Sequence, residues 1–143
     1  MPEKKYVILD TDIGGDIDDH WALGMLLNIP GVEIELVLTS SGDTQYRTKV
    51  AAEFLQSVGR TDIKLGTGIA DPDQHLQETF AADVESYSLD DYPGVTADDG
   101  IAEAIRIIES RPETILIGIG PMTNLAALCR CRPDLMKKCR LTV

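Results

Sequence analysis

Five aspartates crowd into the segment ILDTDIGGDIDDHWAL, between two apolar runs near the start of the chain. They are Asp10, Asp12, Asp16, Asp18 and Asp19. Carboxylates this close raise one another's pKa unless a cation or several N–H donors neutralise their charge. Gly14 and Gly15 permit a tight turn, which lets acids on both sides of it converge. Oxygen donors in such an arrangement suit a hard divalent cation, Ca²⁺ or Mg²⁺.

Helix capping is the alternative explanation for the same residues. Asp16 or Asp18 would serve as N-cap of the helix that follows, because acids suit a helix N-terminus. Capping does not require the two acids that stand where the preceding strand ends. An EF-hand loop is excluded, because its fifth and twelfth positions would be a glycine and a tryptophan. The segment is therefore interpreted as a metal site.

The elements that must position these acids alternate between strand and helix patterns. Short apolar or β-branched runs predict five strands, at residues 6–9, 32–40, 63–68, 114–120 and 140–143. Apolar residues at helical spacing predict helices at 18–28, 44–58, 97–110 and from Pro121 to about Arg130. This alternation favours one α/β domain over residues 1–143, with a Rossmann-like parallel sheet and helices on both faces. Ligands of such sheets bind beyond the carboxyl ends of the strands.

Composition argues against several classes of partner. The 143 residues carry a net charge of −11, so neither nucleic acid nor an anionic membrane is an expected partner. No apolar run approaches the length of a membrane span, and MPEKKYVILD has no signal-peptide-like region, so we expect a cytoplasmic protein. The cysteines lack a fourth zinc ligand nearby and are expected to be reduced thiols: Cys129, Cys131 and Cys139.

The aspartate segment resembles the N-terminal signature of the inosine–uridine preferring nucleoside hydrolases, in a DTDIG-x-D-x-DD variant with two extra residues. Three further blocks resemble the same family in the same order: LTSSGD (38–43), DYPG (91–94) and IGIGPMTNLA (117–126). The resemblance implies a nucleoside hydrolase-like fold, of which these residues form the N-terminal part. It also implies Ca²⁺-dependent hydrolysis of ribonucleosides to base and ribose, by a homo-oligomer.

The resemblance assigns roles to single residues. Asp12 and Asp19 would be carboxylate ligands of Ca²⁺, and the backbone carbonyl of Ile119 a third ligand. Asp12 would also be the general base that activates the attacking water. Asp18 would bind ribose hydroxyls, and Asp10 would support the cluster.

Two acids depart from the family pattern. Asp43 stands where the family has an asparagine that contacts ribose, and an ionised acid accepts hydrogen bonds but cannot donate them. Asp16 lies in the two-residue insertion, so we expect it at the surface or behind the ligands. With a strand order of 3-2-1-4-5, Asp10 and Gly118 lie on neighbouring strands, and Asp12 and the Ile119 carbonyl converge across one crevice.

Cleavage passes through an oxocarbenium-like state of the sugar, and the leaving base, which takes the electron pair of the broken C–N bond, needs a proton. In the family, a histidine and an adjacent aspartate from the C-terminal half supply it, and the 143 residues end before that segment. Neither histidine matches by motif: we expect His20 to pack or face solvent, and His75 to lie in the long polar stretch 69–95. Trp21 is expected in the core. The chain alone is therefore predicted to be a poor hydrolase.

Two other functions remain open. One is a non-catalytic fragment or degenerate homologue that binds metal and ribose. The other is a haloacid-dehalogenase-like phosphohydrolase, in which Asp10 would be the nucleophile of an Asp-x-Asp motif. The second is disfavoured because Gly14 stands where that motif has a threonine.

Overall fold

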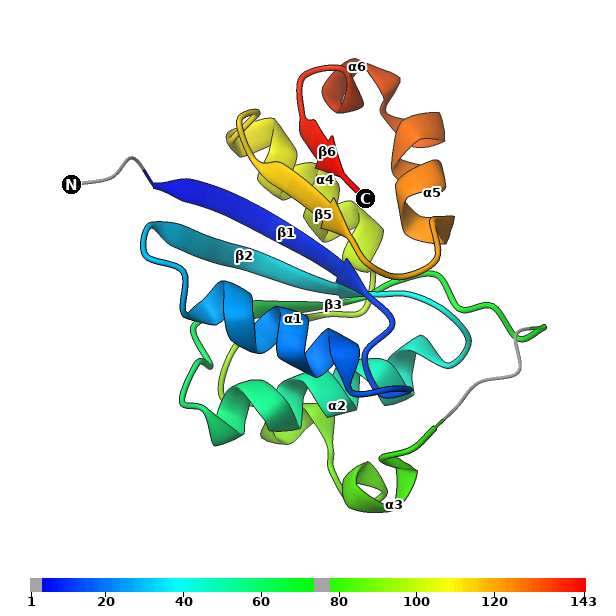
Figure 1. Cartoon of the computed structure of the whole chain (residues 1–143). Coiled ribbons are helices and arrows are strands. Elements are labelled where there is room, and N and C mark those ends of the chain that lie inside the picture. Colours follow the sequence, from blue (N-terminus) through cyan, green and yellow to red (C-terminus); the bar gives the residue numbers. More distant parts are fainter. Residues whose placement is uncertain (1–3, 74–77) are drawn as a thin grey trace.

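A parallel sheet forms the centre of the computed structural model, which describes residues 4–73 and 78–143. Its strand order is β4-β3-β2-β1-β5-β6 (Figure 1). The strands are β1 (Lys5–Thr11), β2 (Val32–Thr39), β3 (Lys64–Thr67), β4 (Thr96–Ala97), β5 (Ile115–Gly118) and β6 (Arg140–Thr142). Every neighbouring pair is parallel, as the alternation of strand and helix predicts.

The five predicted strands keep the predicted order, and Asp10 pairs with Gly118 across β1 and β5. The sequence reading missed β4, a two-residue strand that pairs with β3 at the edge of the sheet. It also placed the following helix too early. The Asp99 side chain accepts a hydrogen bond from the amide of Ala102, so the helix begins at Gly100.

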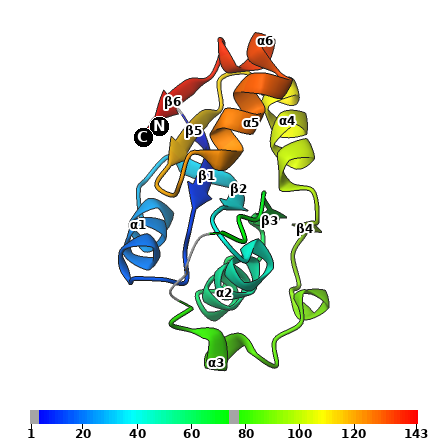
Figure 2. The same cartoon turned by 90° about the vertical axis from the view of Figure 1, so that its right-hand side faces the viewer.

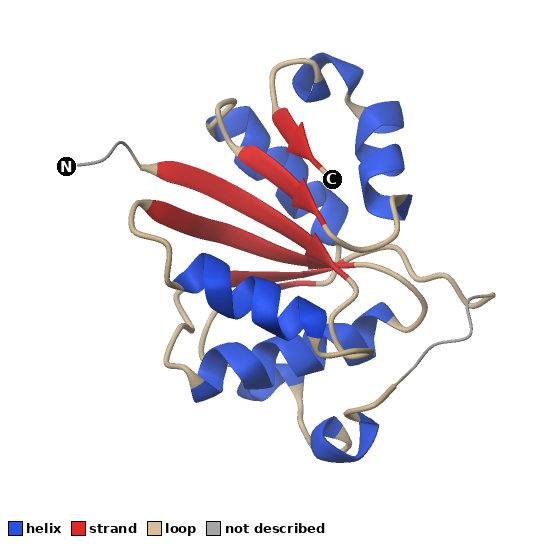
Figure 3. Cartoon of the chain, in the orientation of Figure 1, coloured by secondary structure: helices blue, strands red, loops and turns tan. Residues whose placement is uncertain are grey.

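Helices cover both faces of the sheet (Figures 2 and 3). One face carries α1 (Asp18–Leu27) and α2 (Thr44–Ser57). The other carries α4 (Gly100–Ser110), α5 (Thr123–Cys131) and α6 (Pro133–Met136). The short helices α3 (Ala81–Val84) and η1 (Leu89–Asp91) lie in the polar stretch that follows β3. Within the described residues, no helix is long and apolar enough to cross a membrane.

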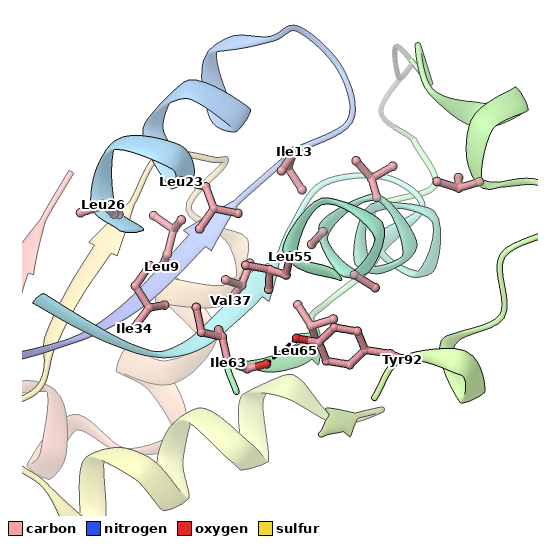
Figure 4. Packing of buried hydrophobic residues seen from close by; sticks show 14 of the residues in the cluster. Leu9, Ile13, Leu23, Leu26, Ile34, Val37, Leu55, Ile63, Leu65 and Tyr92 are labelled. Carbon is pink, nitrogen blue, oxygen red and sulfur yellow. Dashed lines mark hydrogen bonds between the residues drawn. The ribbon is translucent and has the colours of Figure 1, made fainter. Parts of the chain in front are cut away.

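Each face of the sheet has its own apolar cluster. The cluster under α1 and α2 contains Leu9, Leu23, Val37, Leu55 and Leu65 (Figure 4). The cluster on the opposite face contains Ile8, Leu36, Ile108, Leu116 and Leu128. Successive residues of β1 thus enter opposite clusters, which explains the uninterrupted apolar run before the aspartates. A strand buried on both sides fixes the position of whatever follows it.

Two glycines bring α4 unusually close to the sheet. A Cβ on Gly66 of β3 would lie 2.9 Å from the Cα of Gly100 at the start of α4. A Cβ on Gly100 would lie 2.4 Å from Cδ1 of Leu38 and 2.8 Å from the carbonyl oxygen of Thr67. Any side chain at either position would push the helix away from the sheet.

Opposite effects are expected from alanine at two helical glycines. Gly100→Ala should lower the free energy of unfolding by about 1–3 kcal/mol, because the added methyl overpacks the helix–sheet contact. Gly24→Ala, inside α1, should raise it by up to about 1 kcal/mol, because its methyl meets only Phe54 at 3.8 Å and alanine favours helix. Urea unfolding of both variants measures the difference. Equal effects of the two substitutions would contradict the tight contact.

Candidate active site at the carboxyl ends of β1 and β5

Strand β1 ends between two neighbours that hold it in place. The amide of Ile119 donates to the carbonyl of Asp10 at 2.9 Å, and the amide of Ser40 donates to the carbonyl of Thr11 at 2.9 Å. The strand is longer than predicted, so Asp10 lies inside it and is fully buried. The strand order reverses here between β1 and β5, where open α/β sheets bind ligands.

Asn124 of α5 is a buried site residue that the sequence reading did not single out. Its Nδ2 donates to Oδ2 of Asp10 at 2.8 Å and to the carbonyl of Thr39 at 2.9 Å, and its Oδ1 accepts from the amide of Ile69 at 2.9 Å. The other oxygen of Asp10, Oδ1, is buried without a hydrogen bond of good geometry among the described residues, although the Ser40 hydroxyl lies close enough to lower the pKa of Asp10. Burial raises the pKa of Asp10 to about 6, against the opposing effect of the Asn124 amide.

Asp12 and Asp19 are the next carboxylates of the cluster. Burial raises the pKa of Asp12, and the Arg47 guanidinium opposes that rise. Asp19 is only 8% exposed, and its Oδ1 accepts a hydrogen bond from Thr11 Oγ1 at 2.5 Å. Burial raises the pKa of Asp19 to about 6, and the Asp12 carboxylate adds to the effect. The two predicted carboxylate ligands therefore lie close enough to repel each other.

The end of β5 approaches the same carboxylates. A Cβ on Gly120 would lie 3.2 Å from Oδ1 of Asp12 and 2.9 Å from its amide nitrogen. Gly120 directly follows Ile119, whose amide is bonded to β1. The structure thus brings Asp12 and the Ile119 segment together across the switch point, as the strand order predicts.

Helix capping does not explain the exposed acids of the cluster. The N-cap of α1 is Ile17, and no side chain caps this helix. Asp16 and Asp18 are exposed, and Oδ1 of Asp18 accepts a hydrogen bond from the amide of Asp19 at 3.1 Å. The capping interpretation of Asp16 and Asp18 is therefore wrong, and both carboxylates face solvent beside the buried acids.

Asp43 is a helix cap, which the sequence reading missed. Its Oδ1 accepts a hydrogen bond from the amide of Tyr46 at 3.0 Å and so satisfies the first turn of α2. The side chain is otherwise exposed at the carboxyl end of β2. Capping occupies one oxygen and leaves the other available to a ligand.

The aromatic predictions have mixed outcomes. The ring of His20 packs against those of Phe54 and Phe80, with centroids 5.6 and 4.8 Å away, as expected for a packing residue. Trp21 is 73% exposed, so its predicted place in the core is wrong: it lies on the outer side of α1 while Leu23 fills the core. His75 lies outside the described residues.

A cavity of about 360 Å³ lies at the opposite, amino end of the strands. Its charged lining is already paired: Arg111 lies 3.3 Å from Glu35, and Lys64 lies 2.9 Å from Glu103. This cavity and the aspartates lie at opposite ends of the strands, so the cavity is not part of the candidate site.

The donors of the aspartate cluster fit a hard cation. Among the residues that the structure describes, no three His, Cys, Asp or Glu side chains form a metal cage by themselves. Asp12 and Asp19 supply two carboxylates, so further ligands would have to be carbonyl or water oxygens, which Ca²⁺ accepts readily. A bound cation would also offset the repulsion between the Asp12 and Asp19 carboxylates and would stabilise the unsatisfied Oδ1 of Asp10.

The metal-free chain should lose stability as the pH rises. The pKa of Asp10 in the folded chain, about 6, exceeds its ordinary value of 3.8. The contribution of Asp10 to the free energy of unfolding is therefore fully present below about pH 4. It falls by on the order of 3 kcal/mol as the pH rises through 6. Urea unfolding in EDTA at pH 4 and pH 7 measures the loss. Asp10→Asn should show a clearly smaller loss and Asp16→Asn the same loss as the wild type; equal losses in all three would refute the assignment.

The model of the inosine-uridine preferring nucleoside hydrolase family matches residues 7–143. The non-specific ribonucleoside hydrolase RihC of Salmonella paratyphi B is 30% identical, over 94% of this chain and 46% of RihC. The probable uridine nucleosidase 2 of Oryza sativa subsp. japonica is 27% identical, over 87% of this chain and 40% of the relative. The chain thus spans less than half the length of these relatives.

Solved structures show the same fold. A plant nucleoside hydrolase, the PpNRh1 enzyme, superposes with a TM-score of 0.74 at 27% identity, over 94% of this chain and 45% of that one. An inosine-guanosine nucleoside hydrolase superposes equally well, with a TM-score of 0.74 at 22% identity, over 95% and 45% of the two chains. With the family model matched from β1 to the last residue, the chain belongs to the inosine-uridine preferring nucleoside hydrolase family.

Proposed function

We propose that this chain provides the metal- and ribose-binding part of a Ca²⁺-dependent ribonucleoside hydrolase. The observation that carries the proposal is the group formed by buried Asp10, buried Asp19 and half-buried Asp12 at the switch point, where burial raises the pKa of all three carboxyls. Family membership supports the reaction class. The names of the relatives support a ribonucleoside as substrate.

Asp12, Asp19 and the carbonyl of Ile119 are the proposed ligands of Ca²⁺. When bound, the ion would supply positive charge that offsets the carboxylates and orients water and ribose hydroxyls. Asp12 is the proposed general base, because its carboxylate is half-buried and still reaches solvent, where it can accept a proton from water. Asp10 supports the cluster from inside β1, held by Asn124.

Asp18 and Asp43 are the proposed ribose contacts. Both are exposed carboxylates at the carboxyl end of the sheet, and both can accept hydrogen bonds from sugar hydroxyls. Their negative charge would also stabilise the oxocarbenium-like transition state. Because Asp43 already caps α2, its geometry toward the sugar is set by the helix.

His20 is the one histidine among the described residues, and its ring packs against two phenylalanines, so it is not proposed as the proton donor to the leaving base. A second candidate function is therefore a metal- and ribose-binding module without turnover. The phosphohydrolase hypothesis is not supported, because the matching family is that of the nucleoside hydrolases. Cytoplasmic location and homo-oligomeric assembly stay predictions.

Calcium binding should depend on the two proposed carboxylate ligands. Asp12→Asn and Asp19→Asn should each weaken Ca²⁺ affinity by about tenfold or more, because each removes a charged ligand. Calorimetric titration measures the affinity. Asp16→Asn, an exposed acid of the same segment, is the matched control and should bind like the wild type. Equal affinity in all four proteins would disprove the site.

Turnover of the 143-residue chain should be slow. A missing general acid costs about 10²–10⁴ in rate, so ribose release from inosine and uridine should fall below that of RihC by such a factor. Asp12→Asn should abolish the remaining release. Rates equal to RihC would place the acid within these residues, and His75 would be the first to mutate. Calcium binding with no release at all would favour the binding module.

A further inference from the structure

We propose that Tyr46 and Arg47, in the first turn of α2, form a clamp that positions Asp12 by holding the backbone of the turn Asp12–Gly14. The inference deepens the proposed function, because it names the positioning residues of the same site. Both residues follow the Asp43 cap, and neither was singled out from the sequence.

Three successive carbonyl groups of the turn point toward α2. Nη1 of Arg47 donates to the carbonyl of Asp12 and to that of Ile13, the latter at 3.0 Å. Oη of Tyr46 donates to the carbonyl of Gly14 at 2.8 Å. Two adjacent side chains of one helix therefore satisfy three adjacent acceptors, a match that fixes the path of the turn.

The guanidinium of Arg47 also reaches the turn after β2. Its Nε donates to the carbonyl of Ser41 at 2.7 Å. Ser41 has φ 75°, a left-handed conformation that is energetically unfavourable for any residue other than glycine. One planar group thus joins the turn after β1 to the strained turn after β2, which lysine could not do with a single nitrogen.

Burial makes this contact specific. Arg47 is only 2% exposed, so its charge has been taken out of water and needs compensation. The backbone acceptors supply hydrogen bonds, and the nearby Asp12 and Asp19 carboxylates supply opposite charge. Arg47 is thus a cation that belongs to the protein and lies beside the carboxylates.

The tyrosine side of the clamp is packed as tightly. Gly14 has φ 110°, and a Cβ there would lie 3.0 Å from Cε1 and 3.2 Å from Oη of Tyr46. Only glycine therefore lets the turn approach the ring. The same Oη of Tyr46 accepts a hydrogen bond from the amide of Phe80 at 3.0 Å, which fixes the position of the hydroxyl group. A second donor, the amide of Thr79, also reaches the carbonyl of Gly14 at 3.2 Å.

Amide hydrogen exchange tests the clamp without metal or substrate. The amide of Ile13 donates to Oγ1 of Thr11 at 3.2 Å inside the turn, so its exchange rate reports the turn conformation. Arg47→Lys should raise the Ile13 rate at least about tenfold more than the rate of Leu9, in the centre of the sheet. If Arg47 only stabilised the whole fold, Arg47→Lys would raise the exchange rates of Ile13 and Leu9 by the same factor. That result would refute the proposed clamp.

A matched pair of tyrosine variants keeps the test decisive if Arg47→Lys does not fold. Tyr46→Phe removes one buried hydrogen bond to the turn and should raise the Ile13 rate roughly fivefold relative to Leu9. Tyr92→Phe is the control: Oη of Tyr92 donates to the carbonyl of Ile63 at 2.7 Å, at the other end of β3, so the ratio should not change. Equal ratios in Tyr46→Phe and Tyr92→Phe would refute the tyrosine half.

Calcium titration of the same variants separates this inference from the proposed function. The clamp requires Arg47→Lys to weaken Ca²⁺ affinity about tenfold although the positive charge is kept, because the turn that presents Asp12 is no longer held. Affinity unchanged in Arg47→Lys would show that the charge alone matters and would contradict positioning. A wild type that binds no Ca²⁺ would refute the proposed function, while the exchange ratios still decide the clamp.

Discussion

Strand β1 is packed between two apolar clusters, and its last residues carry a carboxylate into that interior. Asp10 cannot move to water, because its backbone is bonded to both neighbouring strands. Such a group needs partners in place, since an unmet buried charge is costly. Asn124, reaching across from α5, meets this need for one oxygen of Asp10. Thr11 bonds to the neighbouring carboxylate of Asp19, and Arg47 holds the turn that follows. The site therefore follows from the burial of one strand.

These polar contacts come from elements far apart in the sequence. Asn124 joins the ends of β1, β2 and β3, and Arg47 joins the turns after β1 and β2. Asn124 makes three hydrogen bonds to other parts of the chain, and Arg47 makes three to backbone carbonyls of the two turns. At the carboxyl end of the sheet these two side chains act together with threonine hydroxyls that join β2, β3 and α2. Helix ends and apolar packing hold the rest. Local sequence patterns predict helix ends and apolar packing, but not hydrogen bonds between a side chain and distant parts of the backbone.

This division explains what the sequence could predict. Alternating apolar runs located β1, β2 and β5 and their order, because a buried strand requires that pattern. The two-residue strand β4 exists only through its pairing with β3 and has no pattern of its own. The aspartate cluster was visible as crowded charge, but Arg47 was not: a single basic residue on a helix is normally solvated. The available signal for a buried Arg47 was its position four residues after the Asp43 cap, among apolar residues of α2 that face the sheet, such as Tyr46 and Val50.

The exposed Trp21 has a spectroscopic consequence. It is the sole tryptophan of the chain, and in the folded state its indole already faces water. Its emission should therefore shift little when the chain unfolds, and fluorescence would be a poor measure of folding here. The same indole lies on α1, two residues from Asp19 and three from Asp18. Asp18, three residues earlier, lies on the same side of the helix as the indole, so we expect the fluorescence intensity to report on events beside the candidate active site.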